Sequence, residues 1–119
     1  MSHIGHNGGP LDPFAIAAEM GKRGEEWADK HAAAEALEEA QKSVLAEIAA
    51  DYKATNAKTS MAEAETFARA SRKYREFVAE MVEARRLANR ARVRFDTWRA
   101  YIEMLRSREA TQRAEMTLR

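Results

Sequence analysis

Two histidines and three glycines at the start of the chain are the residues whose types and spacing come closest to a chemical site. Residues 4–10 read IGHNGGP, and His3 and His6 stand three apart. On a helix that spacing would aim two imidazoles at one metal ion, but Gly5 disfavours a helix and no third ligand is near. The glycines could also cradle a phosphate, yet neither a Walker lysine nor GxGxxG follows. We therefore expect no metal, no cofactor and a flexible leader over residues 1–11, or a short linear motif that a partner reads.

The body of the chain lacks a recognisable catalytic set. His31 is a single histidine in an alanine-rich stretch, and the sequence has no cysteine, so thiolate chemistry and disulfides are excluded. The acidic pairs at 25–26 and 38–39 are sequence neighbours, which point in different directions on a helix. The ExxH motif of di-iron bundles is also missing. We predict that the chain is not an enzyme and has no catalytic residue.

The composition is typical of long helices. Charged residues make up 33% of the 119 positions, with five glycines and two prolines. No apolar run reaches the roughly 18 residues of a membrane span, and the N-terminus does not look like a signal peptide. The sequence therefore predicts an intracellular all-α protein that does not associate with membranes.

Capping signals divide the body into two helices. Asp12 followed by Pro13 marks the start of a helix over residues 12–56, in which the glycines near 21–24 predict a kink or short break. A polar turn follows at 55–60, where Ser60 and Glu63 form a capping box. A long helix is expected from there over residues 60–116.

The second helix carries a seven-residue apolar repeat. Its a positions are Phe67, Tyr74, Met81, Ala88, Phe95 and Ile102, and its d positions are Ala70, Phe77, Ala84, Ala91, Trp98 and Leu105. We call these a and d positions the seam. The repeat predicts that the large side chains of the seam form a coiled-coil core packed against a partner helix. The fold expected is an elongated antiparallel helical hairpin or coiled coil forming a single domain over residues 12–119.

The two halves of the chain have opposite charge. Residues 1–66 hold six Lys or Arg against twelve Asp or Glu, a net −6, and residues 67–119 hold fourteen against seven, a net +7. In the hairpin, facing residues should have numbers that add to about 116 or 117, which places Tyr52 near Phe67 and Glu26 near Arg92. The e positions form a row of arginines that would border the acidic helix. These are Arg85, Arg92, Arg99, Arg106 and Arg113.

Two sets of side chains fall outside this seam. The apolar residues Leu87, Val93, Tyr101 and Met104 predict a protein interface, either with a second copy in a homo-oligomer or with another protein. The cations Arg86, Arg90 and Arg94 are the candidate nucleic-acid contacts, since arginine matches phosphate geometry. The sequence pI of about 8.1 is lower than the value above 9 typical of a dedicated nucleic-acid-binding domain.

The opening stretch MSHIGHNGGPLD resembles the IGHNGGP-type leader of otherwise unrelated small proteins encoded by phages and prophages of alphaproteobacteria. The resemblance covers about a dozen residues and implies a phage accessory protein in the cytoplasm of a bacterial host. We expect it to bind an unidentified host or phage protein, inhibition being one form of action. The alternative is a DNA- or RNA-binding accessory of phage recombination or replication, and a third class is a structural virion component.

Overall fold

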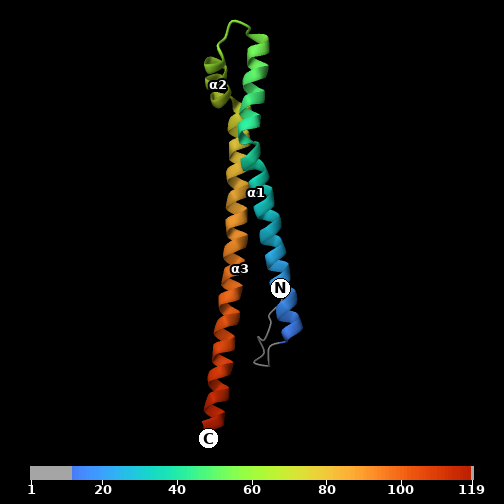
Figure 1. Ribbon diagram of the computed structural model, residues 1–119, viewed down its shortest axis with the longest axis vertical. Coiled ribbons are helices and arrows are strands. Elements are labelled where there is room, and N and C mark those ends of the chain that lie inside the picture. The colour runs from blue at the N-terminus through green and yellow to red at the C-terminus, as the bar shows by residue number, and fades with distance from the viewer. Residues whose placement is uncertain (1–11, 119) are drawn as a thin grey trace. The chain divides into compact units, whose positions relative to one another are not determined.

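The computed structural model describes residues 12–118, and its regular structure there is entirely helical. Three helices follow one another, α1 (Pro13–Thr55), α2 (Met61–Ala70) and α3 (Arg72–Leu118) (Figure 1). The predicted all-α helical hairpin is confirmed. The leader expected over residues 1–11, with His3 and His6, lies outside the described residues. Among the described helices, none has an apolar stretch long enough to cross a membrane.

Helix α1 begins where the capping signal predicts. The Oδ1 atom of Asp12 accepts a hydrogen bond from the backbone N–H of Phe14 at 2.9 Å, which satisfies one of the free donors of the first turn. The helix then runs through Gly21 and Gly24 without interruption, so the break expected near 21–24 is absent. Each glycine lowers helix stability by about 1 kcal/mol relative to alanine, and the many alanines of α1 favour the helix around them.

The predicted second helix is divided in two at Ser71. Helix α2 starts as expected, because the Ser60 side chain accepts a hydrogen bond from the N–H of Glu63 at 3.2 Å. It ends after ten residues at Ser71, whose backbone is extended, with φ −69° and ψ 149°. The Ser71 hydroxyl donates to the carbonyl of Ala68 at 2.6 Å and accepts from the N–H of Tyr74 at 3.2 Å. One side chain thus closes α2 and starts α3, and the single helix predicted over 60–116 is wrong here.

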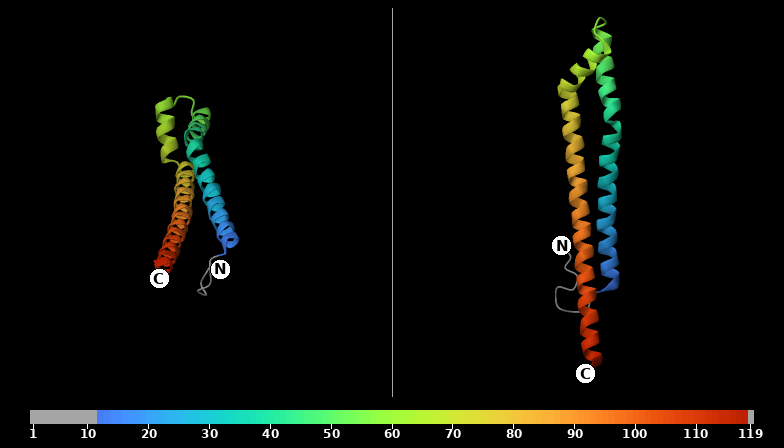
Figure 2. Two further views of the ribbon diagram at one scale, coloured as in Figure 1. Left: turned by 60° about the horizontal axis from the view of Figure 1, so that its bottom comes forward. Right: turned by 60° about the vertical axis from the view of Figure 1, so that its left-hand side comes forward.

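The described residues form two compact units. Residues 12–28 and 89–118 make up what we call the terminal unit, and residues 29–88 make up the central unit. Helices α1 and α3 contribute to both units, whereas α2 belongs to the central unit. Figure 2 shows α2 meeting α3 at an angle on the far side of the turn from α1.

The core of the central unit is built largely from alanine. Ile48 and Ala49 of α1 pack against two buried alanines of α2, Ala64 and Ala68. The half-buried side chains around this cluster are Val44, Leu45, Tyr52 and Tyr74. Further along the same unit Ala34 and Ala88 are buried almost completely. Small side chains of this kind let two helices approach each other closely.

The core of the terminal unit relies more on aromatic rings. Ala91 and Ile102 of α3 are buried. The rings of Trp27 and Phe95 stack with their centroids 5.7 Å apart, and the same phenyl ring lies against Gly24. Offset stacking at this distance adds to the apolar burial of both rings.

Most of the predicted seam faces inward, but its first members do not. Beyond Ser71, the large seam residues from Tyr74 to Leu105 are half-buried and Ile102 is buried. Phe67 is 47% exposed, although its ring stacks on Tyr52 at 3.8 Å between centroids, and Ala70 is exposed. The reason is that a helical repeat keeps one face only while the helix continues, and the helix stops at Ser71.

The predicted register needs correction along α3. Tyr52 does lie against Phe67, as expected. Glu26, however, pairs with Arg94 at 2.6 Å instead of Arg92, and Trp27 stacks on Phe95, although the expected register would place it near residue 89 or 90. The offset lies in the terminal unit. In the central unit the expected register holds beyond the break at Ser71, because Gln41 donates to the Tyr74 hydroxyl at 3.0 Å and Arg85 contacts His31 at 3.2 Å, pairs whose numbers add to 115 and 116.

Candidate interaction surface

Helix α3 carries a line of exposed apolar side chains in the terminal unit. Val93, Tyr101 and Met104 are 62%, 38% and 60% exposed. Their spacings of eight and three residues place them on one face of the helix, away from the face that buries Ile102. We call this the outer face of α3. Its members are Arg90, Val93, Arg94, Thr97, Tyr101, Met104 and Arg108.

The outer face borders a groove of about 410 Å³. The residues that line it are Arg23, Val93, Arg94, Thr97, Trp98 and Tyr101. The Arg23 guanidinium lies 5.0 Å from the centre of the Trp98 ring, a cation–π contact, and donates to Glu19 at 2.9 Å. Tyr101 packs beside the same indole at 5.7 Å between ring centres. The groove is therefore largely apolar, with two guanidinium groups at its edge.

One polar atom beside this groove is unsatisfied. The indole Nε1 of Trp98 is buried and has no hydrogen-bond partner among the described residues. A buried N–H without an acceptor costs about 1–3 kcal/mol. The donor belongs to a side chain that also lines the groove.

The three predicted nucleic-acid contacts differ in their electrostatic state. Arg86 binds both carboxylate oxygens of Glu83, at 2.9 and 2.7 Å, and Arg94 donates to Glu26 at 2.6 Å. The hydrogen bonds that Arg86 donates to Glu83 raise the pKa of Arg86 further above its ordinary value. Arg90 is exposed and forms no ion pair with any described residue. Two of the three charges are thus already neutralised by the chain itself.

Leu87, the fourth predicted interface residue, does not belong with the other three. It lies in the central unit, where it is half-buried, whereas Val93, Tyr101 and Met104 are exposed in the terminal unit. The structure therefore brings together three of the four apolar residues that the sequence singled out.

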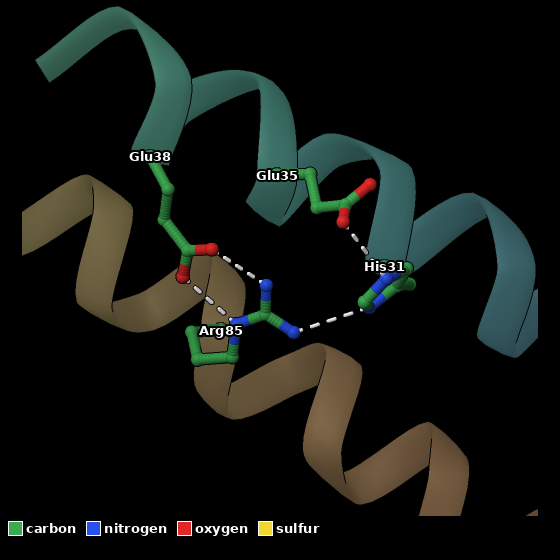
Figure 3. Close-up of polar contacts among 4 residues, drawn as sticks. All are labelled: His31, Glu35, Glu38 and Arg85. Carbon is green, nitrogen blue, oxygen red and sulfur yellow. Dashed lines mark hydrogen bonds and ion pairs between the residues drawn. The ribbon is translucent and has the colours of Figure 1, made fainter.

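A second polar cluster lies in the central unit around Arg85 (Figure 3). Its guanidinium donates to both carboxylate oxygens of Glu38, at 2.8 and 2.6 Å. A third nitrogen lies 3.2 Å from Nδ1 of His31, whose Nε2 lies 3.3 Å from Glu35. The Arg85 contact fits a neutral imidazole that accepts at Nδ1 and donates from Nε2 toward the carboxylate.

This cluster connects α1 to α3, and its hydrogen bonds shift the pKa values of Glu38 and Arg85. The hydrogen bonds from Arg85 lower the pKa of the Glu38 carboxyl below its usual 4.5, against a smaller opposing effect of burial. The same hydrogen bonds raise the pKa of Arg85. Side chains of His31 and Glu35 are 43% and 56% exposed. Because these side chains are solvated, we expect the cluster to help set the register of the two helices and not to transfer protons.

The predicted row of e-position arginines is only partly a border with the acidic helix. Arg85 reaches Glu38 across the hairpin, as expected. Arg92 and Arg99 instead lie 3.8 and 3.9 Å from Asp96 on their own helix. The sequence missed the contact of Arg23 with Trp98, which no helical repeat indicates because the two residues lie on different helices. Among residues 12–118, no group of three potential metal ligands comes together.

Comparison with other proteins adds no constraint on the role of these surfaces: no protein family, characterised protein or solved structure matches this chain.

Proposed function

We propose that the chain is a non-enzymatic accessory protein of phage or prophage origin that binds another protein through the outer face of α3. Its partner would be a host or phage protein in the bacterial cytoplasm, and occupying that partner would inhibit it. The observation that carries the proposal is the exposure of Val93, Tyr101 and Met104 beside an apolar groove. Contiguous exposed apolar side chains are typical of protein interaction sites.

The composition of the face supports a protein partner. Tyr, Met and Arg are enriched in protein interfaces, and all three residue types lie together here. Arg23 and Arg94 at the groove edge are held by Glu19 and Glu26, at 2.9 and 2.6 Å. Guanidinium groups fixed in this way are preorganised, so a partner does not have to order them on binding.

The alternative is a DNA- or RNA-binding accessory of recombination or replication. It is favoured by Arg90 and Arg108, which are exposed and unpaired with any described residue, on the same face as Tyr101. An exposed aromatic ring next to free cations is suited to base stacking. Against it, a phosphate would have to displace carboxylates from Arg86 and Arg94, where the N–O distances are 2.7 and 2.6 Å.

Site-specific photo-crosslinking in living cells tests the proposal. Tyr101→p-benzoylphenylalanine places the crosslinker on the outer face, and Ala110→p-benzoylphenylalanine is the matched control at an exposed position elsewhere on α3. We expect adducts with a different protein from position 101 and not from position 110. Double substitution of Val93 and Met104 by serine should abolish function while circular dichroism still reports a folded helix.

A second experiment tests the nucleic-acid-binding alternative. DNA binding is followed by fluorescence anisotropy with labelled single and double strands at about 50 and 200 mM salt, because phosphate-driven affinity falls steeply over that range. Salt-sensitive binding that Arg90→Glu removes, together with no protein adduct at position 101, would refute the protein-binding proposal and establish the alternative.

A further inference from the structure

In the central unit, helix α1 has an exposed face of opposite charge to the outer face of α3. Asp29, Glu39 and Glu47 are exposed and form no ion pair with any described residue. Between them lie small side chains that are also exposed, and the helical repeat places all of them on the side of α1 away from buried Ala34. We call this the acidic face of α1. Its members are Asp29, Ala32, Ala36, Glu39, Ser43 and Glu47.

The acidic face of α1 and the outer face of α3 match in length. One extends over residues 29–47 and the other over residues 90–108, which is about 27 Å of helix in each case. The two faces also have side chains of complementary size, because alanines and a serine on one face would pack against Val93, Tyr101 and Met104 on the other. Large side chains pack well into a surface of small ones, since the helix axes can then approach closely.

The charges of the two faces are complementary as well. Arg90 and Arg108 are unpaired on one face, as are the three carboxylates on the other, among the residues that the structure describes. The nearest carboxylates on α3, Asp96 and Glu103, fall on a different side of that helix from the outer face. Opposite charges on facing surfaces set the register of association and exclude the like-charged arrangement.

We propose that the outer face of α3 in one copy of the chain docks on the acidic face of α1 in a second copy. This inference rests on the proposed function, because it assigns a partner to the same outer face. Both faces are exposed within a single chain, so packing within one copy covers neither of them. Each copy presents one face of each kind, so every copy offers the surface on which another copy can dock.

A consequence is that self-association and binding of another protein compete. Val93, Tyr101 and Met104 are covered in the self-associated form and become available only when the copies separate. A target protein must therefore present a surface that resembles the acidic face of α1, with carboxylates among small side chains.

Charge reversal followed by mixing tests the inference on the full chain. Variant one carries Arg90→Glu and Arg108→Glu, so that both of its faces are acidic. Variant two carries Glu39→Lys and Glu47→Lys, which changes the charge of its acidic face from −3 to +1. The matched control, Arg106→Glu with Arg113→Glu, makes the same change in net charge on another side of α3.

Sedimentation velocity at low and high salt gives the oligomeric state, and circular dichroism verifies that each variant is folded. We expect the unmodified chain and the control to associate, more strongly at low salt. Each variant alone should have a dissociation constant at least about tenfold higher, and an equimolar mixture of the two should recover association.

Three results would overturn the inference: an unmodified chain that is monomeric at low salt, association that neither variant weakens, or a mixture that stays monomeric. The proposed function fails separately. A monomeric chain whose position 101 still crosslinks a different protein keeps the proposed function and loses the second copy as partner. If mixing restores association but position 101 gives no adduct with a different protein, the second copy is kept as partner and the proposed function is lost.

Discussion

Replacing Ser71 with alanine removes one hydroxyl that serves two helices. That hydroxyl accepts from the Tyr74 N–H at 3.2 Å and donates to the Ala68 carbonyl at 2.6 Å. Loss of a serine N-cap costs about 1 kcal/mol. Alanine has the higher helix propensity, but residue 71 has extended backbone, so that preference gives no stability while the break persists. The free energy of unfolding should therefore fall by about 1 kcal/mol, which lowers the melting temperature by roughly 4 °C.

Urea unfolding followed by circular dichroism measures this change. With a slope of about 2 kcal/mol per molar urea, the midpoint should move down by about 0.5 M. Ser107→Ala is the control, because Ser107 is exposed on α3 outside both named faces and its hydroxyl makes no hydrogen bond with a described residue, so its effect should stay within about 0.5 kcal/mol. A Ser71→Ala variant as stable as the unmodified chain, or more so, would show that the hydroxyl does not hold the break and that α2 and α3 can fuse into one helix.

Three further substitutions test other parts of the structure. Arg85 lowers the pKa of Glu38 below 4.5, so the stability that the pair contributes is complete above the unfolded pKa and is lost as the pH falls through the folded one; the melting temperatures of the unmodified chain and of Glu38→Gln should therefore converge as the pH falls below 4.5. Ala34→Leu should cost about 1–3 kcal/mol in urea unfolding, because Ala34 is fully buried, whereas Ala33→Leu at an exposed position outside the acidic face should be nearly neutral. Trp98→Phe removes a donor that has no acceptor among residues 12–118 and should cost less than about 1 kcal/mol, while Trp98→Ala should cost about 2 kcal/mol or more by the same measurement; equal costs would contradict the assignment of the unpaired N–H.

Local signals in the sequence predicted the ends of the helices well. Asp12 and Ser60 cap α1 and α2 as expected, because a capping side chain acts within three residues and needs no tertiary contact. Ser71 caps in the same way and was missed. The apolar repeat continues across it from Phe67 to Tyr74, and a repeat indicates which side chains share a face without indicating whether the helix between them is continuous.

Contacts between helices were harder to predict. The expected pair Tyr52 and Phe67 was confirmed because it lies next to the turn, where few residues intervene. Farther from the turn, in the terminal unit, Glu26 pairs with Arg94 instead of the expected Arg92. The exposed set was predicted for Val93, Tyr101 and Met104, since those positions face away from the seam. Whether Arg86 and Arg94 form ion pairs depends on where individual carboxylates lie. The total charges of the two halves do not give those positions.

The alanine core limits how this sequence can change over evolutionary time. Of the eight buried hydrophobic side chains within residues 12–118, six are alanines, and the others are Ile48 and Ile102. A larger residue at these positions would force the helices apart, while glycine would weaken the helix. The exposed positions between them have no such restriction. Proteins descended from a common ancestor could therefore differ at most positions and still keep small residues at the buried ones. The spacing of these alanines is the feature by which distant relatives would be recognised.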